Sequence, residues 1–267
     1  MATATIRGNI ALWNIQNGAL VETKFENSVM INSLAYLQDG VYLASGSNDG
    51  KISLWDVTTG ICAHKLALEG DNGRINILAT SPNKPLLASA SRGKNIRVWD
   101  TDRLEFLFTL SCNSEVKSLV FFPDGNKLVS VSEYEVLTWD MDTRQLVTSL
   151  NDPWSRSMTP NTTSALPCDV AISRTGKWLA VLYTEVISVF DTDSHDVDPI
   201  YKWKCSFARS ISFSPDDAWL VSSGYDSIRL WETKNSKFGK CFKMFQHPDV
   251  HRAIFTPDGT RLVSSKR

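Results

Sequence analysis

The residues able to carry out chemistry are few and widely spaced in this sequence. The four histidines lie at isolated positions, and the five cysteines contain no C-x-x-C pair. The chain also lacks a G-x-S-x-G elbow, a phosphate-binding P-loop and an H-E-x-x-H zinc motif. Because catalysis needs a nucleophile, a base and an orienting group held together, the sequence predicts neither an enzyme nor a bound cofactor.

One acidic segment, residues 191–198, brings together four aspartates and His195. Clustered carboxylate oxygens are the ligands that Ca²⁺ prefers, yet this segment lacks the glycine and the final glutamate that an EF-hand loop requires. We therefore expect an ordinary surface loop here and no metal site.

The charge balance gives no support to two classes of partner, although it leaves room for a local basic patch. The 267 residues include 28 Lys and Arg against 29 Asp and Glu, so the net charge is −1, which gives no global attraction to nucleic acid or to an anionic membrane. Neither an apolar leader at the N-terminus nor a long apolar run occurs. The odd number of cysteines fits a reduced chain. We expect an intracellular protein, cytoplasmic or nuclear, with no nucleic-acid or membrane partner.

The elements that must position any site come from a repeated pattern. An apolar residue, any residue, an apolar residue or Thr, an aromatic residue and usually Asp follow one another six times along the chain. The aromatic anchors are Trp13, Trp55, Trp99, Trp139, Phe190 and Trp231. Their spacings of 42, 44, 40, 51 and 41 residues are typical of four-stranded propeller blades.

Each repeat contains further signals ahead of its anchor. An apolar run comes first, then a turn triplet such as Pro123-Asp124-Gly125, then a strand of small residues such as residues 42–47. Proline and glycine supply the backbone angles of a tight strand connection. We denote the four strands a, b, c and d from the innermost outward, with the anchor in strand c, and we expect strand a to be the most buried.

Residues 43–56 read LASGSNDGKISLWD. This stretch resembles the core of a WD repeat, the unit of the WD40 β-propellers, and similar stretches cover nearly the whole chain. The resemblance implies an all-β, WD40-type β-propeller in which the six aromatic anchors are structural. It also implies that Asp49 and Asp226 stabilise the tight turn before strand c. The Gly-His dipeptide of the family is absent from most of the repeats.

The repeats predict one propeller domain over residues 1–267. Complete blades are expected at about 29–67, 74–110, 115–150, 168–204 and 207–245. The sixth blade is a composite of residues 250–267, which supply strands a and b, with residues 1–25, which supply c and d, so that Trp13 faces residues near Leu262. In a competing interpretation residues 2–6 form an additional b strand, and the chain is an incomplete seven-bladed propeller or part of a longer repeat protein.

In WD-repeat proteins, partner contacts often lie near the start of strand a and just before the turn that precedes strand c. Transferred by position, this resemblance implies partner-binding roles for Asn32, Asn48, Asn76, Arg92, Lys117, Glu133, Cys168, Arg209, Tyr225 and His251. Such a rim is polar and mildly basic, which suits an acidic or phosphorylated peptide. We expect a non-catalytic scaffold that binds a protein or peptide. The alternatives are the sensor or oligomerisation portion of a longer regulatory protein and, less favoured, a propeller enzyme.

Overall fold

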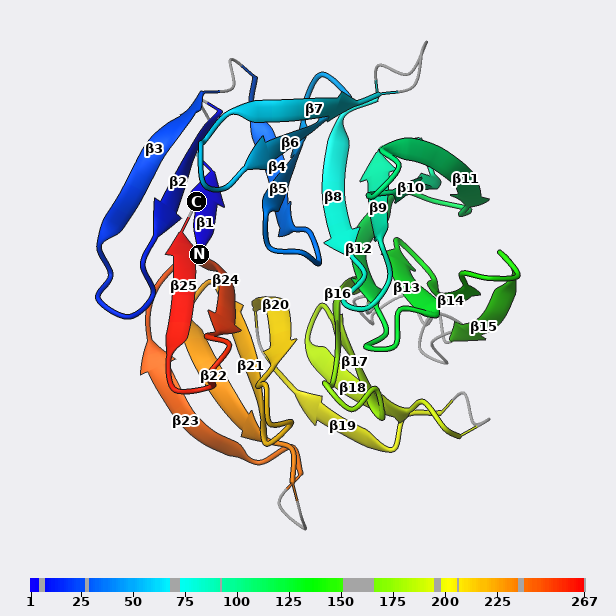
Figure 1. Cartoon of the computed structure of the whole chain (residues 1–267). Coiled ribbons are helices and arrows are strands. Elements are labelled where there is room, and N and C mark those ends of the chain that lie inside the picture. Colours follow the sequence, from blue (N-terminus) through cyan, green and yellow to red (C-terminus); the bar gives the residue numbers. More distant parts are fainter. Residues whose placement is uncertain are drawn as a thin grey trace. The chain divides into compact units, whose positions relative to one another are not determined.

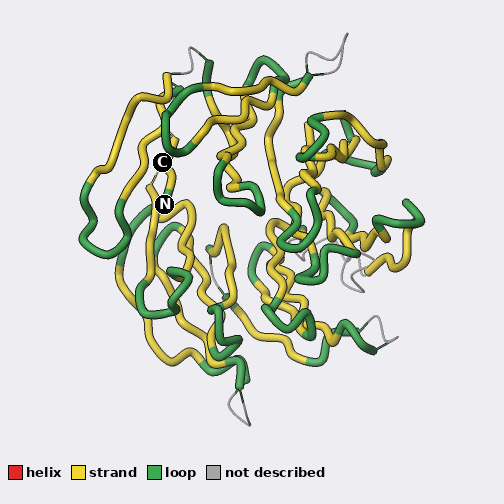
Figure 2. The backbone as a smooth tube through the Cα atoms, in the orientation of Figure 1, coloured by secondary structure: helices red, strands yellow, loops and turns green. Residues whose placement is uncertain are grey.

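The computed structural model describes residues 1–4, 8–26, 29–67, 73–91, 93–150, 166–194, 198–205, 207–234 and 238–266. Over these residues the secondary structure consists of β-strands joined by turns and loops, without a helix (Figures 1 and 2). Within this part of the chain, therefore, no helix is long and apolar enough to cross a membrane. The chain divides into two compact units, residues 1–121 and 122–267.

The first unit contains one three-stranded and two four-stranded antiparallel sheets, β1-β2-β3, β4-β5-β6-β7 and β8-β9-β10-β11, and ends with β12. Its strands are β1 (Ala2–Ala4), β2 (Asn9–Trp13), β3 (Leu20–Glu26), β4 (Ile31–Tyr36), β5 (Tyr42–Ser47), β6 (Ile52–Asp56), β7 (Cys62–Leu66), β8 (Ile75–Thr80), β9 (Leu86–Ser91), β10 (Asn95–Asp100), β11 (Glu105–Ser111) and β12 (Val116–Phe121).

The second unit begins with β13, β14 and β15, which pair in succession, and continues with the sheets β16-β17-β18-β19 and β20-β21-β22-β23 and the hairpin β24-β25. Its strands are β13 (Lys127–Ser132), β14 (Val136–Asp140), β15 (Leu146–Leu150), β16 (Pro167–Ile172), β17 (Trp178–Tyr183), β18 (Val186–Asp191), β19 (Tyr201–Lys204), β20 (Ala208–Phe213), β21 (Trp219–Gly224), β22 (Ser227–Glu232), β23 (Cys241–Gln246), β24 (Val250–Phe255) and β25 (Leu262–Lys266).

In the five four-stranded sheets the most buried strand is the second one, which corrects the expectation that strand a is buried most. In β5, β9, β13, β17 and β21 every residue after the first is buried, whereas β4, β8, β12, β16 and β20 mix buried and more exposed positions. A second strand is paired along both of its edges, while the first strand leaves one edge open. Small residues in the second strand let both of its faces be covered.

The small residues of the second strand also accept hydrogen bonds from the anchors. The indole N–H of Trp55 donates to Ser45 Oγ at 2.8 Å, and that of Trp231 donates to Ser222 Oγ at 2.8 Å. Trp99 and Trp139 make the same bond to serines of β9 and β13. These four indoles are buried. A buried indole N–H needs an acceptor, which explains why serine recurs in a strand that is otherwise apolar.

The N-terminal sheet differs from the predicted half-blade. Residues 1–25 were expected to supply only strands c and d, but β1 occupies the b position and pairs with β2. Trp13 donates its indole N–H to Thr3 Oγ1 at 2.8 Å and its backbone N–H to Met1 O at 2.8 Å. The position beside β2 is therefore occupied by β1, which lies within residues 2–6, where the competing interpretation expects an additional b strand. Val250–Phe255 and Leu262–Lys266 pair as the hairpin β24-β25.

The aspartates that end the repeated pattern stabilise the turns that follow them. Asp56 Oδ1 accepts the backbone N–H groups of Thr58 and Thr59, both at 2.8 Å, and Asp140 does the same for the turn after β14. These bonds, chiefly the one from Thr59, lower the pKa of Asp56. The Asp that closes the repeated pattern therefore forms an Asx-turn between the third and fourth strands of its sheet.

Candidate partner-binding clusters

Arg209, Tyr225 and Asp249 form a cluster within the second unit. Arg209 lies in β20, Tyr225 in the turn between β21 and β22, and Asp249 directly before β24. The guanidinium carbon lies 3.4 Å from the centroid of the Tyr225 ring, and Nη1 lies 2.9 Å from Asp249 Oδ1. The contacts with Tyr225, and then those with Asp249, raise the pKa of Arg209. The structure thus brings together two of the residues that the sequence predicts, Arg209 and Tyr225.

Backbone hydrogen bonds between turns hold the cluster in place. Tyr225 N–H donates to Phe207 O at 3.2 Å, and Asp249 N–H donates to Tyr225 O at 2.8 Å. Phe207 and Asp249 both adopt left-handed backbone angles, with φ of 58° and 57°. Gly224 permits the close approach, because a Cβ at that position would lie 1.9 Å from Phe207 O. Glycine is therefore required there for space.

The cluster exposes a mixed aromatic and cationic surface. Phe207 and Tyr225 are 62% and 57% exposed, and the Arg209 side chain is 24% exposed. Exposed aromatic and arginine side chains held in fixed positions are typical of interaction hot spots. Sequence reasoning missed Phe207 and Asp249, because neither lies at a position that the repeat marks for partner contacts.

The remaining predicted residues of the second unit differ in exposure. Glu133 and Cys168 are half-buried, and the Cys168 thiol donates to Leu166 O at 3.2 Å while its side chain packs against a hydrophobic cluster. His251 is exposed at the second position of β24.

The first unit contains a separate polar network around Asn32. The Asn32 amide donates to Asn48 Oδ1 and to Ile75 O, both at 2.8 Å, and its Oδ1 accepts Arg74 Nη2 at 3.0 Å. Arg74 was not predicted, since it directly precedes β8 rather than lying at a position marked by the repeat. Its buried Nε has no hydrogen-bond partner among the described residues. Among the described residues, the Arg74 guanidinium therefore donates a hydrogen bond to a neutral amide.

Three other predicted residues belong to this unit. Asn76 donates to Glu115 Oε1 at 2.9 Å, and Lys117 is exposed in β12. Arg92 lies outside the described residues.

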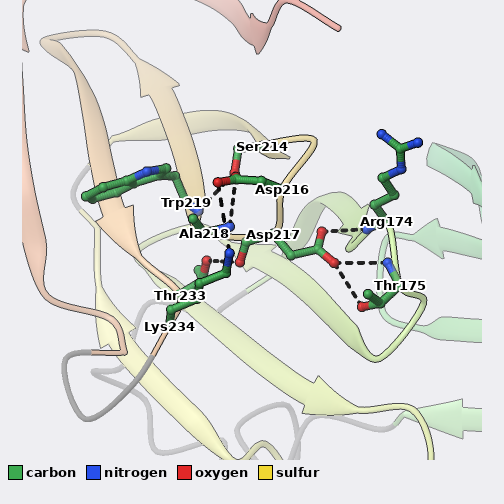
Figure 3. Close-up of polar contacts among 9 residues, drawn as sticks. All are labelled: Arg174, Thr175, Ser214, Asp216, Asp217, Ala218, Trp219, Thr233 and Lys234. Atoms are coloured by element: carbon green, nitrogen blue, oxygen red, sulfur yellow. Dashed lines mark hydrogen bonds and ion pairs between the residues drawn. The ribbon is translucent and has the colours of Figure 1, made fainter. Parts of the chain in front are cut away.

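Asp217 connects the sheet that contains Arg209 to the neighbouring sheet (Figure 3). Its carboxylate accepts Arg174 N–H at 2.6 Å, Thr175 N–H at 3.0 Å and Thr175 Oγ1 at 2.9 Å, all from the turn between β16 and β17. Asp217 is buried and has a φ of 55°. The sequence predicts only a turn at Pro215-Asp216-Asp217; the second aspartate, where three other turn triplets have glycine after aspartate, is the one feature that distinguishes this turn.

Over the described residues, no group of three or more His, Cys, Asp or Glu side chains could hold a metal ion. Within the acidic segment 191–198, residues 195–197, including His195, lie outside those residues.

Comparisons with known proteins agree with this architecture. The family model described as "WD domain, G-beta repeat" matches residues 20–56, 60–100 and 198–232. The transcriptional corepressor LEUNIG_HOMOLOG of Arabidopsis thaliana is 26% identical over 90% of this chain and 29% of its own length. The small ribosomal subunit protein RACK1y of Oryza sativa subsp. japonica is 31% identical over 40% of this chain and 32% of its own length. These matches span about a third or less of each relative.

A solved structure shows the same fold. One chain of the crystal structure of the mitotic checkpoint complex superposes with a TM-score of 0.83, covering 99% of this chain and 82% of that one at 22% identity. The fold class predicted from the sequence, an all-β, six-bladed propeller, is therefore confirmed. The join of the two chain ends in one composite blade stays a prediction.

Proposed function

We propose that this chain, which is a WD40-repeat protein, acts as a non-catalytic interaction module that binds a peptide or protein partner through the Arg209 cluster. The observation that carries the proposal is the Arg209 guanidinium stacked at 3.4 Å on an exposed tyrosine, beside the exposed Phe207. WD40 propellers are typically protein-interaction scaffolds, which supports a role in binding a partner. We also propose an intracellular location, in keeping with five free cysteines.

The partner that fits this cluster carries a carboxylate or phosphate next to an apolar residue. Arginine binds such groups through two parallel N–H donors, and Tyr225 fixes the plane of the guanidinium. Asp249 already occupies one nitrogen, Nη1. An incoming anion therefore shares Arg209 with Asp249 or displaces it, while Phe207 and Tyr225 contact the apolar part of the ligand.

A degenerate library of phosphoserine and glutamate-rich peptides tests this proposal against a matched neutral library. We expect the acidic peptides to bind, and the Arg209→Glu variant to weaken a selected peptide by about 2 kcal/mol in fluorescence anisotropy, as loss of a hot spot does. Arg103→Glu is the matched control, because Arg103 is exposed and its guanidinium lies 3.7 Å from the Glu105 carboxylate. Equal affinity of the wild type and the Arg209 variant would refute the cluster as the binding site.

A further inference from the structure

The outer strand β19 alternates between aromatic and basic side chains. Its four residues read Tyr-Lys-Trp-Lys, and the two aromatic residues are half-buried while the two lysines are exposed. The strand pairs with β18 over all four residues without a shift of register. Because side chains of a regular strand alternate between its faces, Tyr201 and Trp203 lie on one face and Lys202 and Lys204 lie on the other.

The aromatic face of β19 is fixed by packing against the next sheet of the same unit. The Tyr201 ring stacks on that of Phe238 with the ring centroids 3.9 Å apart, and the Trp203 ring lies 5.8 Å from that of Trp231. Trp231 belongs to β22, and Phe238 lies in the loop between β22 and β23. A strand that is already held in place loses little conformational freedom when a partner binds to it.

The opposite edge of β19 is free of other strands in the described part of the chain. β19 is last in the order β16-β17-β18-β19 and pairs with β18 (Figure 1). Just after the strand, Cys205 N–H donates to Glu185 O at 2.9 Å. Hydrogen-bonded residues alternate along an antiparallel pair, so the backbone groups of Lys204 and Lys202 point away from β18. An added strand would bond to these groups, which is the geometry of β-augmentation.

The charge on this edge restricts what can pair with it. Residues 199–204 include two lysines and no acidic residue. Lysine on an edge strand opposes pairing with another strand of the same kind. Two-fold antiparallel pairing with a second copy would set Lys202 opposite itself or opposite Lys204, because directly opposite residues share a face. The edge therefore disfavours a second copy and favours a strand that carries carboxylates.

We propose that the free edge of β19 binds an extended partner segment in which acidic and apolar residues alternate. An added strand places its side chains beside those of β19 on the same face. Its carboxylates then meet Lys202 and Lys204, and its apolar side chains lie beside Tyr201 and Trp203. This surface is separate from the Arg209 cluster and does not depend on it.

A synthetic peptide of alternating valine and glutamate is the probe, used with the full chain in fluorescence anisotropy. We expect saturable binding that the double substitution Lys202→Glu and Lys204→Glu weakens about tenfold, because attractive pairs become repulsive. Lys65→Glu on β7 is the matched control, since Lys65 is an exposed lysine of another outer strand, and it should leave the affinity unchanged. Arg209→Glu should also leave it unchanged. Binding that is lost with Arg209→Glu and kept in the double variant would overturn the proposal.

Two further measurements separate strand addition from simple charge attraction. The bound peptide should slow hydrogen exchange at the backbone N–H groups of Lys202 and Lys204, which point to the free edge. A valine–glutamate peptide methylated at every backbone nitrogen keeps its charges but cannot donate these hydrogen bonds, so we expect it not to bind. Unchanged exchange at both amides, or equal binding of the methylated peptide, would overturn the proposal. A dimer in sedimentation that protects the same two amides would assign the edge to a second copy instead.

Discussion

The two units each hold an arginine close to the start of a sheet's first strand, and the two guanidinium groups are held differently. Arg209 in the second unit has a carboxylate at 2.9 Å and an aromatic ring below it, whereas Arg74 in the first unit donates to the neutral amide of Asn32 at 3.0 Å. The first arrangement compensates the charge and fixes the plane of the group, whereas the contact that the described residues show for Arg74 is with a neutral amide. A basic residue type alone therefore does not reveal how much positive charge a surface offers to a ligand.

The largest expected difference concerns two glycines near the ends of second strands, Gly224 at the last position of β21 and Gly46 at the last but one of β5. Gly224→Ala would set a Cβ 1.9 Å from the backbone oxygen of Phe207, whereas Gly46→Ala would meet the Ile75 side chain, with Cγ2 at 2.4 Å. Backbone atoms are harder to move than a side chain. We therefore expect the free energy of unfolding to fall by about 3 kcal/mol in Gly224→Ala and by about 1.5 kcal/mol in Gly46→Ala. Urea unfolding of the two variants measures both. Equal losses would show that the backbone at Phe207 relaxes as easily as the Ile75 side chain.

A smaller effect concerns the turn between the first and second strands of a sheet. Asp217→Gly removes three hydrogen bonds to Arg174 and Thr175 but relieves a φ of 55°, so we expect a net loss of about 2 kcal/mol. In the first unit Gly40 occupies the corresponding turn, where a Cβ would contact nothing within 4 Å. Gly40→Ala should therefore lower the free energy of unfolding only through the strain of an alanine at positive φ, by about 1 kcal/mol. Chemical unfolding of both variants tests whether Asp217→Gly is the more destabilising. An Asp217→Gly variant as stable as the wild type would contradict the prediction.

Asp249 should limit the affinity of Arg209 for an anion. Asp249→Asn removes the competing carboxylate, and we expect the selected acidic peptide to bind about 1 kcal/mol more tightly in fluorescence anisotropy. The counterpart in the first unit, Asn32→Asp, gives Arg74 a carboxylate and should leave that affinity unchanged. A loss of binding with Asn32→Asp would move the peptide site to the first unit.

Acid should affect the second unit through the turn of its β24-β25 hairpin. Hydrogen bonds from Thr256 and Thr260 lower the pKa of Asp258 from 3.8 to about 2. A carboxyl whose folded pKa is lowered stabilises the fold above its unfolded pKa, and that contribution disappears as the pH falls from about 4 to 2. The thermal midpoint of Asp258→Asn should therefore lie below that of the wild type at pH 5 and approach it near pH 2. A constant difference would argue against this role.

The repeat was predictable because its signals are local. The spacing of the anchors from Trp13 to Trp231, the turn triplets and the strands of small residues all recur within single repeats, so they indicated an all-β repeat fold. The extra strand β1 was harder to assign, because its three residues have no turn triplet ahead of them. Sequence reasoning also gave the greatest burial to strand a, since hydrophobicity does not report that a strand is paired along both edges.

The sequence by itself determined the fold class, the anchors' positions and the candidates Arg209 and Tyr225, because these depend on the order and spacing of residues within one repeat. Only the tertiary structure decided that Asp249 compensates Arg209, that Arg74 has a neutral partner and that Asp217 connects two sheets. These contacts join residues about 40 positions apart, from neighbouring repeats. Their geometry is set by how the turns meet in space, which the pattern of any single repeat does not encode.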